Sequence, residues 1–198
     1  MEPIEEQSRN NLFLIDNTAN PAPLGLCAFG MTTILLSLHN VGITGGLNSP
    51  IISMALLYGG LAQVIVGLME WKKNNTFGMV TFGSFGIFWI SFAAILMLPT
   101  TGLAAAATPV DLSAFLSVWG GLLIVGLFIC SLKMHRLLQV TFALLILLVV
   151  LLVAANLTGI HLVHTLAGVT GIVTGILALY LGIGTVINEV YGSRVLPV

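Results

Sequence analysis

Residues 137–157 read LLQVTFALLILLVVLLVAANL, and this stretch decides the fold class. A helix needs about 20 apolar residues to cross the hydrocarbon core of a bilayer, which is about 30 Å thick. The stretch is long enough and carries no charged residue. A strand of a membrane β-barrel would alternate apolar and polar residues over about ten positions, whereas residues 143–155 form one unbroken apolar run. The stretch therefore predicts a transmembrane helix.

The composition of the whole chain agrees with a membrane protein. Of its 198 residues, 58% are hydrophobic and 7% are charged, whereas soluble domains carry about 25% charged residues. This excludes a soluble enzyme, a disordered segment and a nucleic-acid binder with a basic face. The two cysteines, Cys27 and Cys130, lie inside apolar stretches and are interpreted as buried free thiols.

Five further apolar runs accompany the first, so we predict an all-α membrane protein with six transmembrane helices. Lipid offers no partner to a bare backbone N–H or C=O, which forces each run into a helix. The predicted spans are residues 23–38, 50–69, 76–98, 112–132, 137–157 and 162–190. They divide the chain into a polar tail over 1–21, a transmembrane domain over 22–190 and a short tail over 191–198.

The basic residues predict how the helices are oriented. With six spans, every Lys and Arg falls in a tail or loop on one side of the membrane, and the other three loops contain none. The positive-inside rule then places both termini in the cytoplasm. The basic residues are Arg9, Lys72, Lys73, Lys133, Arg136 and Arg194.

Several kinds of functional site have no support in the sequence. The predicted spans contain no Lys or Arg and no acidic pair at mid-membrane, so a pump that relays protons between carboxylates is not expected. A nucleotide-binding loop and a serine nucleophile motif are also missing. His161 and His164 lie three residues apart, which is weak evidence for a metal site. We therefore expect no enzyme activity, no cofactor and no metal.

Neutral polar residues inside the apolar runs are the candidates for function. Thr32 and Thr33 lie midway along the first span, and Gln63 lies in the second. A threonine in a membrane helix ordinarily bonds to the carbonyl four residues before it. An amide facing lipid without a partner costs several kcal/mol, so we expect Gln63 to face the bundle interior. Neutral donors suit a small anion or neutral molecule that is bound loosely enough to pass through.

The tripeptide Asn20-Pro21-Ala22 has two interpretations. Asn-Pro-Ala is the signature of water channels, but that design needs two copies on facing half-helices, and this chain has one. The alternative is a helix start, with Asn20 as a cap and the prolines in the first turn, where a missing N–H costs nothing.

A resemblance to a known family rests on motifs spread over residues 20–197. The first is NPAPLGL at residues 20–26, which comprises Asn20, Pro21, Ala22, Pro23, Leu24, Gly25 and Leu26. Others are FGMTT at 29–33, LHN at 38–40, YGG at 58–60, NTFG at 75–78, RLLQ at 136–139 and RVLP at 194–197. On these motifs the chain resembles the acetate uptake transporter family, the succinate–acetate permeases of bacteria and archaea and their fungal relatives.

The resemblance implies a multi-pass protein of the plasma membrane that transports acetate, and often succinate or other small carboxylates, together with protons. It also implies six helices per protomer, a homo-hexameric ring in the lipid bilayer and a separate path through each protomer. Proton symport and a channel-like path for the anion both stay open as mechanisms. The alternative function is a membrane sensor or scaffold of the acetate response that transports nothing.

The resemblance further implies a hydrophobic constriction built from aromatic residues of the first and third helices and a leucine of the fifth. The motifs match these positions to Phe29, Phe85 and either Leu144 or Leu145. The third-helix residue is often Tyr in relatives, so Phe85 keeps the steric role and lacks the hydroxyl. Such an apolar constriction can gate by dewetting.

Residues chosen from the polar pattern and the resemblance together are expected to line the path. Glu70 and Asn75 are expected at its cytoplasmic mouth. His39, His161 and His164 are expected on the outer side, where an imidazole can exchange protons near physiological pH. The predicted path residues are Thr32, Thr33, Asn40, Tyr58, Gln63, Glu70, Asn75 and Thr76.

Overall fold

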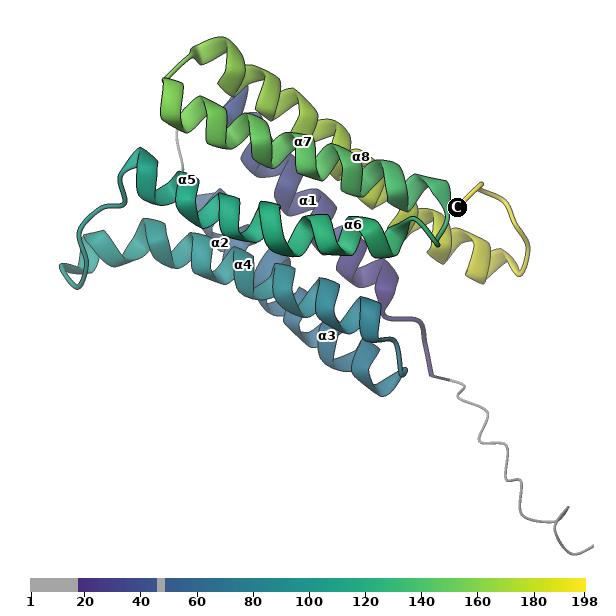
Figure 1. The fold of residues 1–198 in the computed structure, drawn as a ribbon. Helices are drawn as coiled ribbons and strands as arrows, with labels where there is room; N and C mark the ends of the chain where they lie inside the picture. The colour runs from purple at the N-terminus through teal and green to yellow at the C-terminus, as the bar shows by residue number, and fades with distance from the viewer. Residues whose placement is uncertain (1–17, 46–48) are drawn as a thin grey trace, which may run out of the picture.

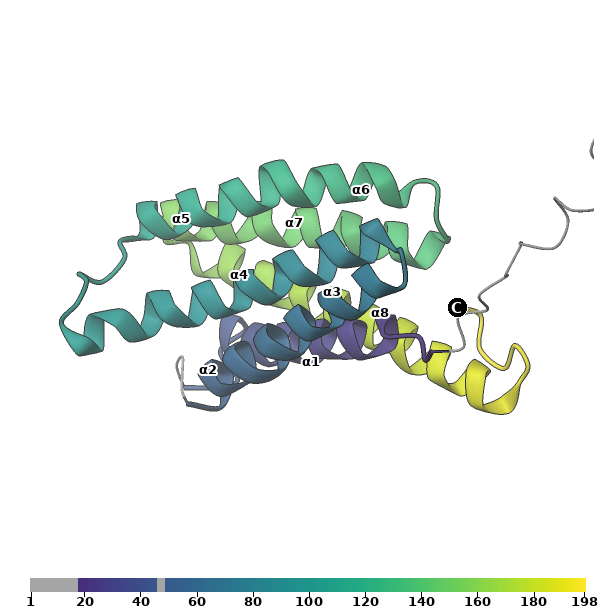
Figure 2. The same cartoon turned by 90° about the horizontal axis from the view of Figure 1, so that it is seen from below.

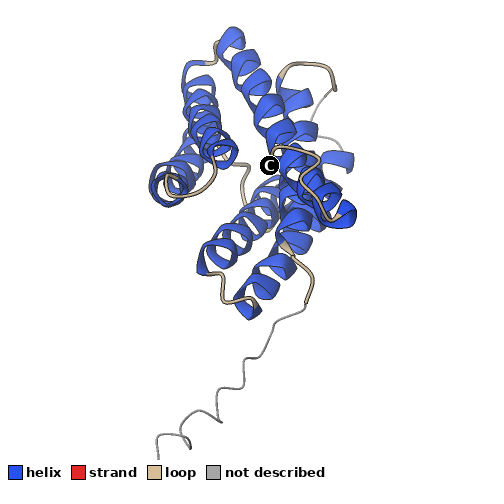
Figure 3. Cartoon of the chain, turned by 90° about the vertical axis from the view of Figure 1, so that its right-hand side faces the viewer, coloured by secondary structure: helices blue, strands red, loops and turns tan. Residues whose placement is uncertain are grey.

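The computed structural model describes residues 18–45 and 49–198, and within these residues every regular element is helical (Figure 3). The elements are α1 (Ala22–Asn40), α2 (Ser49–Leu56), η1 (Leu57–Ala62), α3 (Gln63–Lys72), α4 (Thr76–Thr101), α5 (Pro109–Val118), η2 (Trp119–Ile124), α6 (Val125–Ser131), α7 (Arg136–Thr158) and α8 (His161–Tyr191). The segments η1 and η2 are π-helical. Most of the predicted N-terminal tail lies outside the described residues.

Within residues 18–45 and 49–198, six helices are long and apolar enough to cross a membrane, which confirms the predicted number of spans. The elements α2, η1 and α3 form one continuous helix over Ser49–Lys72, and α5, η2 and α6 form another over Pro109–Ser131. Each observed span covers or nearly covers its predicted run and extends a few residues beyond it at one end or both. The last helix, His161–Tyr191, has 31 residues.

The helices run alternately up and down, so the described start and end of the chain lie at the same end of the bundle (Figure 1). Helix α8 packs against α1 and α7, and α3 packs against α4. Viewed from below, α4 crosses between the α5–α6 helix and the pair formed by α1 and α3 (Figure 2). All described Lys and Arg residues lie outside the helices or at a helix terminus, at the end of the bundle where α1 begins.

Helices α1 and α8 touch backbone to backbone where two glycines meet. A Cβ atom added at Gly30 would lie 2.6 Å from the carbonyl oxygen of Gly175. A Cβ added at Gly175 would likewise lie 2.6 Å from the carbonyl oxygen of Gly30. Close approach of this kind lets membrane helices pack without a hydrophobic driving force. The two glycines therefore set the distance between the two helices.

Each π-helical segment contains a pair of adjacent glycines. The sequence patterns did not predict the π geometry of these segments. The pair Gly59-Gly60 lies in η1, and Gly120-Gly121 lies in η2. A Cβ added at Gly60 would lie 2.5 Å from the Ala55 carbonyl oxygen and 2.7 Å from Ile90 Cγ1, so there is no room for a side chain at this position. Apolar runs predict helices but do not distinguish α from π geometry. π-helical turns are rare, and where they occur they are frequently at functional sites.

Local capping fixes where several helices begin. The side chain of Asn20 accepts a hydrogen bond from the Ala22 N–H at 3.1 Å, which supports the interpretation of NPA as a helix start. At the start of α4, Asn75 Oδ1 accepts from the Gly78 N–H at 3.1 Å. Such caps satisfy backbone donors that have no partner within the helix.

The two cysteines differ in their surroundings. Cys27 is a buried free thiol, as predicted, and Cys130 is a free thiol with an exposed side chain. The interpretation of Cys130 as buried is wrong. Its helix is apolar on all sides, so hydrophobicity alone does not tell which side faces the bundle interior.

Candidate functional site

Two cavities lie within the helix bundle, one toward each end. The cavity near the start of α1, of about 150 Å³, is called the inner cavity here. The cavity near the end of α1, of about 250 Å³, is called the outer cavity. Both are lined mainly by apolar side chains, with a few hydroxyl, amide and imidazole groups among them. A volume of this size accommodates a molecule of a few non-hydrogen atoms.

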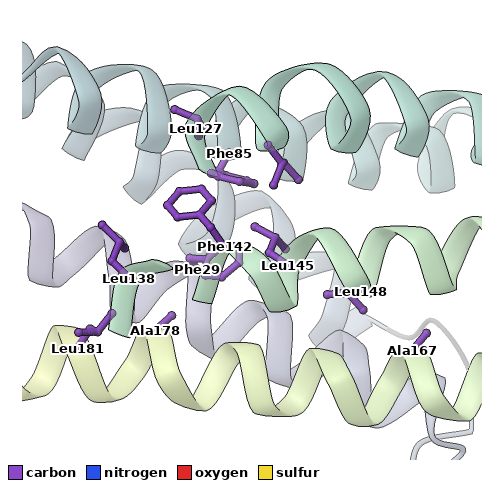
Figure 4. Close-up of a cluster of buried hydrophobic side chains, with 11 residues drawn as sticks. Phe29, Phe85, Leu127, Leu138, Phe142, Leu145, Leu148, Ala167, Ala178 and Leu181 are labelled. Atoms are coloured by element: carbon purple, nitrogen blue, oxygen red, sulfur yellow. The ribbon is translucent and has the colours of Figure 1, made fainter. Parts of the chain in front are cut away.

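Three residues line both cavities and so lie between them: Phe29, Phe85 and Leu145. They come from α1, α4 and α7, and each is at least 93% buried. The rings of Phe29 and Phe85 are 5.3 Å apart between centroids, with their planes inclined by 59°. Figure 4 shows them converging with Phe142 at the centre of a buried cluster. We call Phe29, Phe85 and Leu145 the apolar ring.

The motifs left open whether Leu144 or Leu145 belongs to the constriction, and the structure places only Leu145 beside the two cavities. Leu145 is 6% exposed and contacts both cavities. Leu144 is half-buried and lines neither cavity in the described structure. Successive residues of a helix point about 100° apart, so adjacent positions cannot both face the same narrow space.

The inner cavity contains a buried amide with one free acceptor. Gln63 is fully buried, and its Nε2 donates to the Gly25 carbonyl oxygen at 3.3 Å. A carbonyl oxygen only accepts, so this contact fixes the orientation of the amide. It leaves Oε1 available to accept a hydrogen bond from another group. Oε1 is buried and has no hydrogen-bond partner in the described structure. A ligand that donates a hydrogen would satisfy it.

Two hydroxyl groups accompany Gln63 in the inner cavity. Thr141 Oγ1 donates to the carbonyl oxygen of Leu137, four residues earlier, at 2.8 Å. Thr81 Oγ1 is buried without a hydrogen-bond partner in the described structure. Thr81 therefore offers a free hydroxyl to a ligand, whereas Thr141 has already used its donor.

Glu70 is buried beside the inner cavity but does not line it. The side chain is 2% exposed, and its Oε2 accepts from Asn75 Nδ2 at 2.8 Å. Asn75 in turn caps α4 through Gly78 and itself lines the cavity. The carboxylate of Glu70 thus lies behind Asn75, where it orients the amide. An acidic group kept off the cavity wall does not repel an anion at close range.

An imidazole also reaches the inner cavity. His135 precedes α7 and lines the cavity while remaining partly exposed. Burial lowers the pKa of His135 below its ordinary value of 6.5, because the charged ring loses part of its hydration. The inner cavity therefore has a mostly neutral polar lining near pH 7.

The outer cavity combines an aromatic wall with a cluster of polar side chains. Trp89 and Phe92 from α4 and Trp119 from η2 lie in the wall. The Trp89 and Phe92 rings meet edge to face, with centroids 6.2 Å apart. The polar lining residues are Thr33, Ser37, His39, Asn40, Asn156 and His164.

Of the predicted path residues, four line a cavity and four do not. Gln63 and Asn75 line the inner cavity, and Thr33 and Asn40 line the outer cavity. The other four, Thr32, Tyr58, Glu70 and Thr76, line neither of the two cavities.

The four residues that line neither cavity have identifiable surroundings. Thr32 is fully buried against Gly59, where an added Cβ would lie 2.7 Å from Thr32 Cγ2. Tyr58 is half-buried in η1, and Thr76 is exposed at the start of α4. Thr32 and Thr33 are adjacent on one helix, so only one of them faces the outer cavity.

The NPAPLGL motif contributes mainly helix geometry. Ala22 and Leu26 line the inner cavity, and the Gly25 carbonyl oxygen accepts from Gln63. A Cβ added at Gly25 would lie 2.5 Å from the ring of Phe82, so glycine lets α4 approach α1. Leu24 is exposed on the outside of the helix. Pro21 and Pro23 are buried at the helix start.

Several lining residues were not predicted from the sequence. A weak periodic signal exists on α7, where Leu138, Thr141 and Leu145 share one face at spacings of three and four. The surrounding helix is so rich in Leu and Val that this face has no hydrophobic contrast. Other unpredicted lining residues are Ser37, Thr81, Trp89, Trp119, His135, Phe142 and Asn156.

No group of three or more His, Cys, Asp and Glu residues is placed to hold a metal ion within the described part of the chain. His39 and His164 both line the outer cavity, whereas His161 is exposed and lines neither cavity.

Comparison with known proteins gives a consistent result. A family model described as the GPR1/FUN34/yaaH family matches residues 9–197. The succinate-acetate/proton symporter SatP of Escherichia coli K12 is 46% identical over 180 residues, covering 91% of this chain and 95% of SatP. An uncharacterized protein of Methanothermobacter thermautotrophicus is 45% identical over 204 residues, covering 100% of this chain and 99% of that protein.

A solved structure also matches. The structure of the bacterial acetate channel SatP superposes with a TM-score of 0.88 at 45% sequence identity. The match covers 91% of this chain and 99% of the SatP chain. The resemblance stated on the sequence motifs is thereby confirmed.

Proposed function

The chain belongs to the GPR1/FUN34/yaaH family, and we propose that it transports acetate together with protons across a membrane through its two cavities and the apolar ring. The ring is the observation that carries this proposal, because Phe29, Phe85 and Leu145 border both cavities. Two cavities that lie toward opposite ends of the bundle and share these three lining residues have the arrangement that a transport path requires. The relatives named as an acetate symporter and an acetate channel support the same substrate.

The lining fits a small carboxylate that passes quickly. The few polar groups that line the two cavities include hydroxyls, amides and imidazoles, and none of the lining residues is Lys or Arg. A guanidinium would hold a carboxylate bidentately and slow its release. Transport requires sites that bind well enough for entry and weakly enough for exit. Succinate and other small carboxylates are proposed as further substrates on the same grounds.

Uptake of labelled acetate into proteoliposomes tests the proposal. The purified protein is reconstituted, an inward proton gradient is imposed, and uptake is compared with protein-free liposomes, which account for acetic acid that crosses the lipid unaided. We expect uptake clearly above the protein-free level. Equal uptake in both would contradict transport and favour a sensor or scaffold of the acetate response.

The coupling of acetate to protons is tested by electrical recording. Symport of one proton with each acetate moves no net charge, so it gives no current and instead acidifies the liposome interior as acetate enters, whereas an anion channel gives a current whose reversal potential follows acetate alone. One SatP relative is named a succinate-acetate/proton symporter and the SatP of known structure an acetate channel, so both outcomes agree with the relatives. Neither an acetate-dependent current nor an internal acidification above that of protein-free liposomes would contradict both mechanisms.

A homo-hexamer in the plasma membrane, with both termini in the cytoplasm, completes the proposal. Many large apolar side chains of a single chain are exposed, including Leu57, Leu61 and Leu68 on the second span, so lipid or neighbouring protomers must cover them. Native mass spectrometry of the detergent-solubilised protein measures the number of protomers. Protease accessibility of tags at each terminus in intact cells measures the orientation. We propose no catalytic reaction for the path.

A further inference from the structure

We propose that the outer cavity holds a carboxylate-binding, proton-exchanging site formed by His39 and His164. This inference deepens the proposed function and rests on it, because it assigns the proton step of transport to named atoms. The two histidines come from α1 and α8, far apart in sequence, and line the same cavity. Histidine is the side chain that ordinarily gains or loses its charge between about pH 5 and 8.

The backbone fixes which nitrogen of His164 exchanges the proton. His164 Nδ1 lies 3.2 Å from the Asn40 carbonyl oxygen. A carbonyl oxygen accepts only, so Nδ1 carries its hydrogen in both charge states. Nε2 is then the ring nitrogen that takes up and releases a proton. When it is protonated it becomes a second donor, which a carboxylate oxygen accepts.

His39 supplies a second nitrogen that needs a partner. Its Nδ1 is buried and has no hydrogen-bond partner in the described structure. If His39 takes up a proton, both ring nitrogens become donors, and the one at Nδ1 is left unsatisfied in a buried place. An unsatisfied buried donor is costly. A carboxylate oxygen in the cavity removes that cost, so binding of the anion and of the proton favour each other.

The surroundings leave the two histidines as the sources of positive charge in this cavity. Its other polar lining groups are neutral hydroxyls, amides and indole N–H groups, and the N–H of Trp89 is buried without a partner in the described structure. Asp111, at the same end of the bundle, is outside the lining, and its Oδ2 accepts from the Thr108 N–H and hydroxyl. No other titratable side chain of α1, of α8 or of the elements packed against them lines the outer cavity. These side chains are Cys27, Tyr58, Glu70, Lys72, Arg136, His161, Tyr180, Glu189 and Tyr191.

The proton transfer step follows from this arrangement. A carboxylate enters from the outside and pairs with the His164 imidazolium. The Nε2–H bond breaks as an O–H bond forms on the carboxylate, which leaves a neutral imidazole and a neutral carboxylic acid. The neutral acid crosses the apolar ring without carrying a charge through it, which avoids the large cost of burying an ion. The imidazole then regains a proton from the outer solution.

The inner cavity provides a matching acceptor on the other side of the ring. Gln63 Oε1 is buried and has no partner in the described structure. It accepts a hydrogen from the O–H of a carboxylic acid, whereas a carboxylate has no hydrogen to donate. A neutral acid therefore fits the inner cavity better than the anion.

The test uses His164→Asn, with His161→Asn as the matched control. The Asn side-chain amide places a donor near the position of Nδ1 and removes Nε2, so the contact to Asn40 is retained. His161 lies one turn away on the same helix, is exposed and lines neither cavity. Acetate uptake by proteoliposomes is measured at external pH values from 5.5 to 8, with the internal pH held constant.

We expect His164→Asn to lower uptake by roughly tenfold, as the loss of a charged hydrogen bond predicts, and to flatten the dependence on external pH. His161→Asn is expected to behave as the unmodified protein. A profile of unchanged shape in His164→Asn, whether its amplitude falls or not, overturns the inference. No uptake by the unmodified protein instead overturns the proposed function, so the two failures are distinguishable.

A spectroscopic measurement gives a second readout that does not depend on transport. The chain has four histidines, so ¹⁵N-histidine labelling yields a small set of signals that single variants assign. We expect acetate at a fixed pH near 6.5 to move the His164 Nε2 signal toward the protonated form and leave the His161 signals unchanged. A His164 signal that does not respond to acetate overturns the inference. Folding of each variant is checked by its thermal melting in detergent.

Discussion

The rings of Phe29 and Phe85 meet between the two cavities, with centroids 5.3 Å apart and planes inclined by 59°. A tilted contact at this distance is favourable for aromatic rings, because the edge of one ring meets the face of the other. Both side chains also belong to the same buried cluster. On the proposed path, passage between the two cavities therefore requires at least one of these side chains to move.

Replacing Phe29 by Ala is expected to open the ring. The substitution removes one of the two rings in contact, so the barrier to passage falls. We expect acetate uptake by proteoliposomes to rise by up to about tenfold, which corresponds to a barrier lowered by about 1.4 kcal/mol. Phe128→Ala is the control, because Phe128 is half-buried and lines neither cavity. An unchanged rate in Phe29→Ala would remove Phe29 from the path.

The pair Leu145→Ala and Leu144→Ala tests which leucine belongs to the ring. Leu145 borders both cavities and Leu144 borders neither. We expect Leu145→Ala to admit longer carboxylates such as butyrate, measured by competition with labelled acetate, and Leu144→Ala to keep the original selectivity. Truncating a buried leucine also costs about 2–5 kcal/mol of stability, so melting is measured in parallel. Equal selectivity in the two variants would argue against this assignment.

Gln63→Leu is expected to impair transport at the inner cavity. The substitution removes the free acceptor Oε1 and leaves the Gly25 carbonyl oxygen without its donor. We expect uptake to fall by roughly tenfold, the effect of leaving a buried polar group unsatisfied. Gln139→Leu is the matched control, because Gln139 bonds the Met134 carbonyl oxygen at 2.9 Å and does not line a cavity. If both variants lose transport equally, the defect is one of folding.

Gly175→Ala is expected to destabilise the protein. The new Cβ would lie 2.6 Å from the Gly30 carbonyl oxygen, and backbone cannot move aside as a side chain can. Forcing one extra carbon into a packed contact costs about 1–3 kcal/mol, which should lower the melting temperature in detergent by several degrees. Gly126→Ala is the control, since nothing lies within 4 Å of its added Cβ. Equal melting temperatures would contradict a tight α1–α8 contact.

The pKa of the His135 imidazole is expected to lie below that of free histidine. Burial lowers its pKa from the ordinary value of 6.5. Between the lowered pKa and pH 6.5 the unfolded chain therefore binds more protons than the folded chain. The contribution of His135 to the free energy of unfolding is complete above pH 6.5 and is lost as the pH falls through the lowered pKa. A ¹⁵N titration of the ring measures the midpoint. A midpoint at or above 6.5 would contradict this assignment of the environment.

The functional residues were predictable from the sequence to different extents. Phe29 and Gln63 stand out as an aromatic residue within a motif and as an amide within an apolar run. Thr141 has only the weak periodic signal of its helix face, and Trp89 lies among similar apolar neighbours and has no local signal. Tyr58 and Thr32 were expected on the path, and the structure places them away from both cavities. A polar residue in a membrane helix points inward, but several helices meet inside, and sequence does not tell which interior surface it reaches.

The sequence by itself determined that the protein lies in a lipid bilayer and in which order its helices follow one another. Apolar runs of about 20 residues force helices in lipid because backbone groups need internal partners, and the six runs reappear as six spans. Only the tertiary structure decided that Leu145 rather than Leu144 borders both cavities, and that His164 meets the Asn40 carbonyl oxygen. The rotation of each helix about its axis depends on contacts such as that between Gly30 and Gly175. Those contacts join residues far apart in the chain, and an apolar run that is uniform around its axis does not specify them.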